Sequence, residues 1–161
     1  MKFLQKMKQK KADNKGFSLV ELIIVIAIMA ILVGIVGTQV IPYINKSREA
    51  RDFQIISSYS TAGMTAYAAN ADSVDTVDAS GAPLTIVVDM YTGTPAAGSD
   101  EALLQEEVEL LTDNNVPDFE SELYDGAADI RITFNFNTNE ITAQAVDASG
   151  AGIGEAVVSE M

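Results

Sequence analysis

The segment that decides the fold is residues 15–41, which read KGFSLVELIIVIAIMAILVGIVGTQVI. After Glu21 no Asp, Glu, Lys or Arg occurs until Lys46. The twenty residues from Leu22 to Ile41 would span about 30 Å as a helix, which matches the hydrocarbon core of a bilayer. The sequence therefore predicts a membrane-spanning helix near its N-terminus.

The charges on the two sides of this span differ in sign. Six of the ten basic residues and one of the 23 acidic residues precede Phe17, so the first sixteen residues carry +5 and the remainder −18. Because a basic flank resists translocation, we expect the N-terminus in the cytoplasm and the residues after the span outside the cell. A chain this acidic repels a phosphate backbone, so direct nucleic-acid binding is not expected.

The side-chain inventory argues against an enzyme. The chain has no cysteine and no histidine, which removes thiolate and imidazole metal sites, Cys and Ser-His nucleophiles and disulfides. Asp72, Asp75 and Asp78 recur at a spacing of three, but their loop lacks the alternating ligands and the glycine of a Ca²⁺ loop, which favours solvated charge. We expect no catalytic residue, no metal and no cofactor.

The helix is expected to continue beyond the span, because residues 45–70 contain no proline. An apolar stripe recurs there at three- and four-residue spacing, which is typical of an amphipathic helix; it consists of Phe53, Ile56, Ser60, Met64 and Tyr67. The predicted helix runs from about Ser18 to Asn70.

A hinge is predicted within this helix at Gly34, Gly37 and Pro42. Each glycine costs about 1 kcal/mol and an interior proline about 3 kcal/mol relative to alanine. Pro42 has no backbone N–H and crowds the carbonyl of Thr38. We expect a bend around Thr38 to Pro42 in the isolated subunit and extended backbone between Gly34 and Pro42 in a polymer.

The remainder of the chain reads as a small β-rich head. A β-branched island at 84–91 predicts a strand, and Ser99 can cap a helix ending at Leu111. The alternation at 130–136, the turn at 137–139 and the return at 141–146 predict an antiparallel hairpin, and a last strand is expected at 156–159. The expected fold is α+β, a long N-terminal helix with a hydrophobic and an amphipathic half, packed on a small antiparallel sheet.

The junction Gly16-Phe17-Ser18-Leu19-Val20-Glu21 has simpler interpretations. A cleaved secretory signal has a shorter apolar run and a small-residue cleavage site behind it. A plain signal anchor is a better alternative, because Ser18 and Glu21 have the spacing of a capping box. Neither interpretation explains why a basic leader ends at a glycine directly before an aromatic residue, nor why the span continues as an amphipathic helix.

Taken together, these features resemble the class III signal of the type IV pilin family. The resemblance implies cleavage by a prepilin peptidase after Gly16 and N-methylation of the new N-terminal residue, Phe17. It also implies that Glu21 pairs with the amine of a neighbouring subunit and sets the axial register of a filament. The lack of cysteine is similar to the pilins of Gram-positive bacteria.

The resemblance divides the chain into a leader (1–16), a transmembrane and assembly helix (17–44), the amphipathic half of that helix (45–70) and an extracellular head (71–161). It implies a subunit held in the membrane and then polymerised with copies of itself by the pilus assembly machinery, for adhesion, surface motility or aggregation. Two alternatives remain open, a minor pilin or secretion-system pseudopilin, and a membrane-anchored binding domain that does not polymerise.

Overall fold

The computed structural model describes residues 16–112 and 115–161, and the chain divides into two compact units between Pro42 and Tyr43. Helix α1 spans Leu19–Ile35, the π-helical segment η1 spans Val36–Val40, and α2 spans Ile41–Asn70. Helical residues therefore run without a gap from Leu19 to Asn70, with Ser18 as the N-cap. The long N-terminal helix is confirmed.

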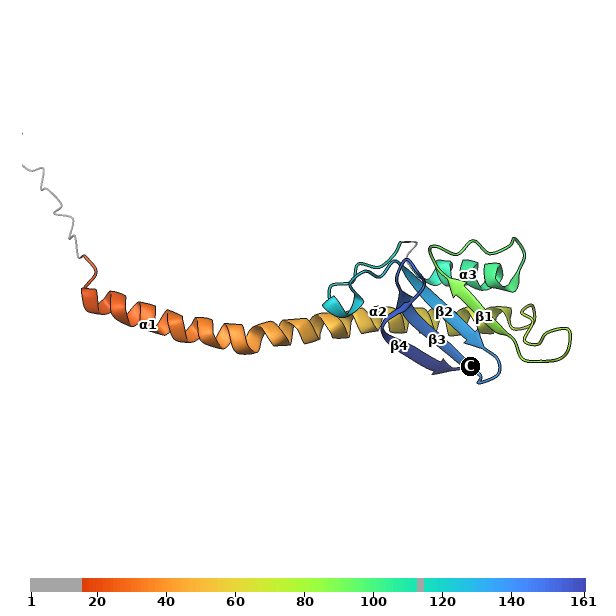
Figure 1. The fold of residues 1–161 in the computed structure, drawn as a ribbon, viewed down its shortest axis with the longest axis horizontal. Helices are drawn as coiled ribbons and strands as arrows, with labels where there is room; N and C mark the ends of the chain where they lie inside the picture. Colours follow the sequence, from red (N-terminus) through yellow and green to blue (C-terminus); the bar gives the residue numbers. More distant parts are fainter. Residues whose placement is uncertain (1–15, 113–114) are drawn as a thin grey trace, which may run out of the picture. The chain divides into compact units, whose positions relative to one another are not determined.

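The head contains one four-stranded sheet in the order β1-β2-β3-β4, in which every pair of neighbours is antiparallel (Figure 1). The strands span Thr85–Asp89, Asp129–Asn135, Glu140–Val146 and Gly152–Glu160. The predicted hairpin is β2 and β3, and the predicted last strand begins four residues earlier than expected. The alternation of buried and half-buried residues along β2 and β3 explains why the sequence pattern located them.

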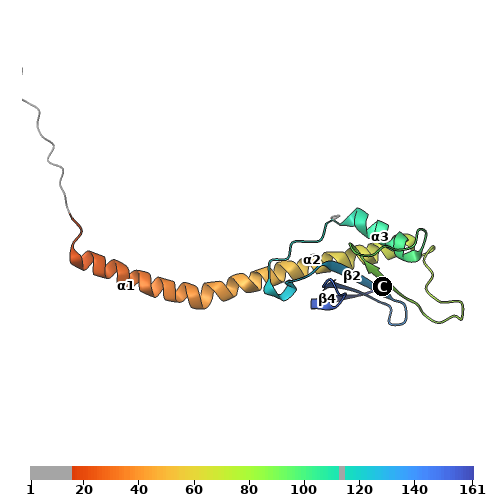
Figure 2. The same cartoon turned by 45° about the horizontal axis from the view of Figure 1, so that its top comes forward.

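Helix α2 lies along one face of this sheet (Figures 1 and 2). Its buried side chains meet the inward-facing residues of the strands in one apolar core, whose largest fully buried members include Ile56, Leu104, Tyr124, Ile130, Ile132, Phe134 and Ile141. The helix approaches the sheet closely at Gly63, where an added Cβ atom would lie 3.1 Å from Ile132 Cγ2 and 3.4 Å from Ile141 Cγ2. The α+β arrangement of a long helix on an antiparallel sheet is confirmed.

The face of α2 that packs on the sheet differs from the predicted stripe. Phe53 and Met64 are exposed, whereas Ile56 and Ser60 are buried as expected. The buried face also contains small residues that the apolar pattern did not mark, namely Ala62, Gly63 and Ala66. Small residues occur on this face because large side chains there would hold α2 away from the strands.

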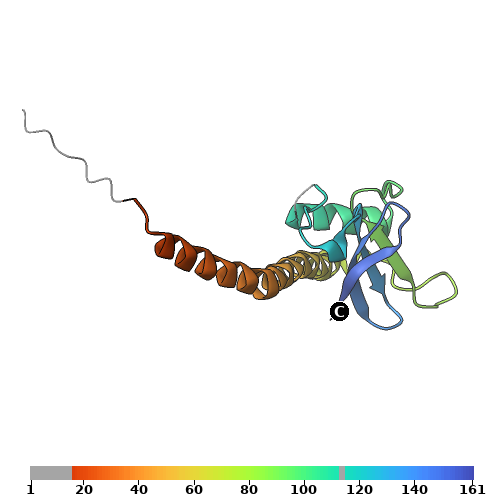
Figure 3. The ribbon, with the colours of Figure 1, turned by 60° about the vertical axis from the view of Figure 1, so that its left-hand side comes forward.

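Helix α3 spans Asp100–Leu111 and begins at Ser99, whose hydroxyl accepts the N–H of Ala102 at 3.3 Å. The predicted cap and helix are confirmed. The coloured ribbon shows that α3 runs beside α2 in the opposite direction (Figures 1 and 3). A segment containing the 3₁₀ turn Glu122–Tyr124 then leads to β2.

Ionic hydrogen bonds supplement the core of this head. Arg131 on β2 donates to both carboxylate oxygens of Asp89 on β1, at 2.7 and 3.0 Å, and to the carbonyl of Gly150 at 2.9 Å. The Asp89 carboxylate raises the pKa of the Arg131 guanidinium. Buried Asp129 accepts the backbone N–H groups of Tyr91 and Thr92 at 2.9 and 2.7 Å. These contacts tie the loops to the sheet in a chain that contains no cysteine.

Candidate processing and assembly site

The predicted cleavage site lies in non-helical chain directly before α1. Gly16 and Phe17 are both exposed, and Phe17 is 90% exposed. A Cβ atom added at Gly16 would meet nothing within 4 Å. The peptide bond between them is therefore open to an enzyme, whereas bonds inside α1 are held in helical hydrogen bonding. The other leader residues, 1–15, lie outside the described residues.

Glu21 lies in the first turn of α1, where its carboxylate accepts the backbone N–H of Ser18 at 2.9 Å. This contact is one half of the capping box, and a negative charge is favoured here by the helix dipole. A carboxylate offers about four acceptor positions, so capping leaves acceptor capacity on Glu21. Capping the helix and pairing with a cation from another molecule are thus compatible.

The surface of α1 is almost entirely apolar, and none of the described residues 16–42 covers it. No residue of Leu19–Ile35 is buried, and the helix is long and apolar enough to cross a membrane. Glu21 carries the only formal side-chain charge between Phe17 and Asn45. Such a surface requires lipid or other apolar helices around it, because exposing it to water is unfavourable.

The predicted hinge residues lie in and beside η1. Gly34 is in the last turn of α1, Gly37 is inside η1, and Pro42 is the second residue of α2. Ile41 donates its N–H to the carbonyl of Val36, five residues earlier, and the Thr38 hydroxyl donates to the carbonyl of Gly34 at 3.0 Å. This rearrangement accompanies a proline that has no N–H of its own to donate. Bending or melting at this place stays a prediction.

The structure contains a buried carboxylate that the sequence pattern did not single out. Asp52 is 0% exposed although it lies on α2. It accepts the N–H of Glu120 at 3.1 Å and the N–H of Ser121 at 2.7 Å, while the neighbouring Arg51 forms an exposed ion pair with the Glu120 side chain. Asp52 therefore fastens residues 120–121 to the helix. The one sequence feature that could have indicated this burial is the spacing, since Asp52 lies one helical turn before Ile56 and therefore on the same face of α2.

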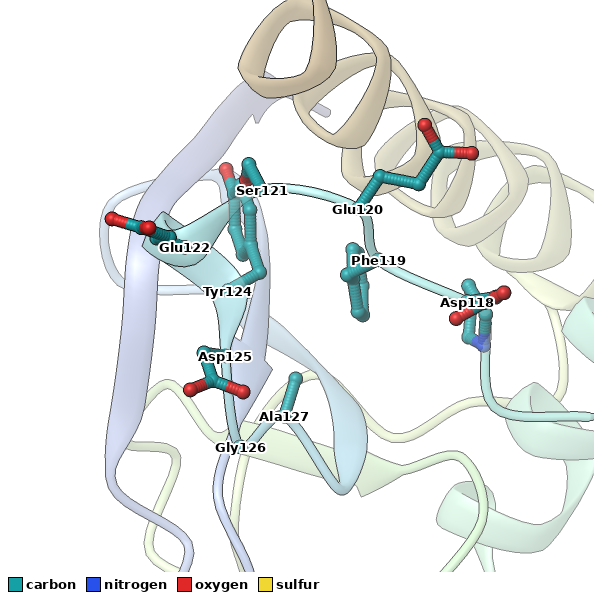
Figure 4. Close-up of a pocket in the computed structure, with 10 residues that line it drawn as sticks. Asp118, Phe119, Glu120, Ser121, Glu122, Tyr124, Asp125, Gly126 and Ala127 are labelled. Atoms are coloured by element: carbon teal, nitrogen blue, oxygen red, sulfur yellow. The ribbon is translucent and has the colours of Figure 1, made fainter. Parts of the chain in front are cut away.

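Residues 117–122 and 124–127, of which Asp52 binds two, line a hollow of about 320 Å³ (Figure 4). The rings of Phe119 and Tyr124 stack with centroids 5.1 Å apart, and Tyr124 is almost fully buried. Burial raises the pKa of the Tyr124 hydroxyl. The Glu120 side chain points toward α2 (Figure 4). These contacts indicate a structural role for the segment.

The sequence also contains a repeated pentapeptide, Asp-Ala-Ser-Gly-Ala, at 78–82 and 147–151. Both copies fold alike, with the aspartate accepting the N–H groups of the serine and of the last alanine at 2.8 and 3.0 Å. The serine hydroxyl is the largest cause that lowers the pKa of Asp78 and of Asp147 below the ordinary 3.8, and backbone N–H groups add to it. Asp78 is thus committed to its own turn, and the described residues contain no group of three or more acidic side chains that could hold a metal ion.

Comparison with known proteins agrees with the geometry of the N-terminus. The model of the prokaryotic N-terminal methylation motif matches residues 11–37, which include the cleavage junction and most of the apolar helix. No curated protein and no solved structure matches the chain. The methylation motif, the long helix and the antiparallel sheet make this cysteine-free chain a type IV pilin-like protein.

Proposed function

We propose that the chain is a structural subunit of a type IV pilus, polymerised through α1 after cleavage between Gly16 and Phe17. One observation carries this proposal, namely an apolar helix with no cover whose only side-chain charge, Glu21, lies at its N-terminal end. Pilin-like proteins are typically structural and non-enzymatic. Prepilin peptidase removes the leader, and Phe17 is then N-methylated.

In this proposal the chain waits in the membrane with its N-terminus in the cytoplasm. Assembly then exchanges lipid for α1 helices of other copies. An ionised carboxylate is unfavourable in an apolar surrounding unless it has a partner. The α-amine of Phe17 in a neighbouring copy supplies that partner, because methylation preserves its positive charge. Apolar burial gives cohesion and Glu21 gives register, and the heads remain outside for adhesion, surface motility or aggregation.

The experiment compares Glu21→Ala and Glu21→Gln with Glu101→Ala. Glu101 is a matched control, because it is also an acid in the first turn of a helix, α3. Both Glu21 variants should leave the amount of mature protein in the membrane unchanged. They should lower the yield of sheared filaments by about tenfold or more, since losing one partner of a desolvated pair costs about 3–5 kcal/mol. Glu101→Ala should assemble like the parent.

Assembly of either Glu21 variant at the level of the parent would contradict the register role. The quantity of the chain in sheared material separates a major subunit from a minor pilin or pseudopilin, because only a major subunit forms the bulk of the filament. A membrane-anchored domain that does not polymerise would instead be absent from filaments.

A further inference from the structure

Among residues 43–112 and 115–161, the head has an open groove with a mixed polar and apolar lining. The groove lies between α2, α3 and the start of the segment after α3, and has a volume of about 650 Å³. Its apolar lining includes Ile55, Leu110, Leu111 and Val116. Leu110 is 75% exposed and Leu111 is 49% exposed. The two adjacent leucines at the end of α3 supply most of the exposed apolar surface among these four residues.

Acidic side chains lie in the wall of the groove and one helical turn before its two leucines. Glu106 and Glu107 lie four residues before Leu110 and Leu111, which places each acid one helical turn from a leucine on the same side of α3. Asp118 lies in the wall of the groove. A ligand for this surface should therefore combine apolar side chains with positive charge about one turn, roughly 5.4 Å, away.

The same chain carries that combination on the first part of α2, residues 43–48, which we call the neck. Tyr43 is 75% exposed and Ile44 is 44% exposed. Lys46 follows Tyr43 by three residues and Arg48 follows Ile44 by four, so each apolar side chain has a cation one turn later on its own side of the helix. The neck thus matches the groove in both apolar character and charge.

The neck contains the cations that form no ion pair in the described residues. From Phe17 onward the chain has four cations, of which Arg51 pairs with Glu120 and Arg131 pairs with Asp89. Within residues 16–112 and 115–161, Lys46 and Arg48 have no ion pair. The two cations not engaged in ion pairs in this acidic part of the chain therefore lie together on the neck.

The neck cannot fill the groove of its own molecule. Ile44 and the groove residue Ile55 belong to the same helix, eleven residues apart, which corresponds to about 16 Å of helix. The occupant must come from another molecule. We propose that the groove binds the neck of a second copy of this chain, with Tyr43 and Ile44 against the two leucines and with Lys46 and Arg48 against Glu106 and Glu107.

The direction of the helices supports this pairing. Along the neck the apolar residues precede the cations, whereas along α3 the acids precede the leucines, so the charges and apolar groups match only when the two helices are antiparallel. Within the head α3 runs opposite to α2 (Figures 1 and 3). Copies stacked with their α2 helices in one direction would therefore present each neck antiparallel to the neighbouring α3. Such a contact joins two different surfaces and propagates as an open polymer.

This inference rests on the proposed polymerisation and is tested by charge exchange in the full chain. The neck variant K46E/R48E and the groove variant E106K/E107K should each lower the yield of sheared filaments about tenfold. The variant that combines all four substitutions should restore the yield to within about threefold of the parent. E155K/E160K on β4 makes the same change in charge as the groove variant, away from the groove, and should assemble like the parent.

The chain lacks cysteine, so crosslinking gives a second test without background. In filaments of the variant I44C/L110C, oxidation should form disulfides between copies and produce a ladder of oligomers. Each single-cysteine variant should give at most dimers. Filaments that form from the double variant without a ladder would overturn the pairing.

The outcomes separate this inference from the proposed function. If the parent forms no filaments, the proposed function fails. If the parent forms filaments and both charge variants do so equally well, only the neck–groove pairing fails. If the neck variant instead loses retention in the membrane while the groove variant assembles normally, Lys46 and Arg48 contact lipid headgroups, and the pairing is overturned.

Discussion

Replacing Asp52 by alanine tests whether the buried carboxylate holds the head together. The substitution removes the acceptor for the N–H groups of Glu120 and Ser121. Ser121 is buried, so its N–H has no ready access to water, whereas Glu120 is exposed. A buried donor left without an acceptor costs about 1–3 kcal/mol, and bonds to charged acceptors lie in the upper half of that range. We therefore expect a loss of about 2–3 kcal/mol, dominated by Ser121.

The neighbouring residue provides the control. Arg51 contacts the same segment through the Glu120 side chain, but the two side chains are 54% and 47% exposed. An ion pair so open to solvent contributes below about 1 kcal/mol. Arg51→Ala should therefore lower the free energy of unfolding only slightly, although Arg51 is adjacent to Asp52.

The assay is urea unfolding of the mature chain in detergent micelles, followed by tyrosine fluorescence, because the chain has no tryptophan. With a slope of about 1.5 kcal/mol/M, a loss of 3 kcal/mol lowers the midpoint by about 2 M, against less than about 0.7 M for Arg51→Ala. Equal midpoints for the two variants would refute the reasoning that the buried carboxylate, and not the ion pair, fastens the segment.

Three further expectations concern the helix, the loops and the hinge. Gly63→Leu should destabilise the head by about 3 kcal/mol, because the leucine enters the contact with the sheet, whereas Ala69→Leu on the exposed face should change its urea midpoint little. The folded-state pKa values of Asp78 and Asp147 lie below 3.8, so both carboxylates contribute stability above that pH and lose this contribution as the pH falls through their lowered values. Urea titrations between pH 5 and pH 2 should show a decrease in the free energy of unfolding. Replacing both aspartates by alanine should make this decrease smaller. A filament map should show extended backbone between Gly34 and Pro42, and an unbroken α-helix there would contradict the hinge.

The elements that could be predicted from the sequence depend on local signals. The span from Leu22 to Ile41 is set by its composition, α3 by the serine cap at its start, and the hairpin by strict alternation around a polar turn. Gly16 stood out because the basic leader ends there, directly before an aromatic residue, and Glu21 because it has the capping-box spacing to Ser18 and is the last charged residue before the apolar run. These signals are complete within a few neighbouring residues, so no tertiary contact is needed to interpret them.

What was missed depends on residues far apart in the chain. Asp52 is buried because a segment nearly seventy positions later supplies its donors, and nothing near Asp52 reveals them. The buried face of α2 includes Gly63 and Ala66 because the sheet approaches closely, a distance that apolar periodicity does not encode. The repeated pentapeptide was visible as a sequence, but its meaning as two equivalent turns required the hydrogen bonds of Asp78 and Asp147.

The mass of the N-terminal peptide from sheared surface filaments tests the central claim most directly. Such filaments should be rich in this chain, and its first peptide should begin at Phe17 and carry the added mass of N-methylation. A chain that retains Met1, or one that begins after Ile41 and has lost the apolar helix, would contradict it.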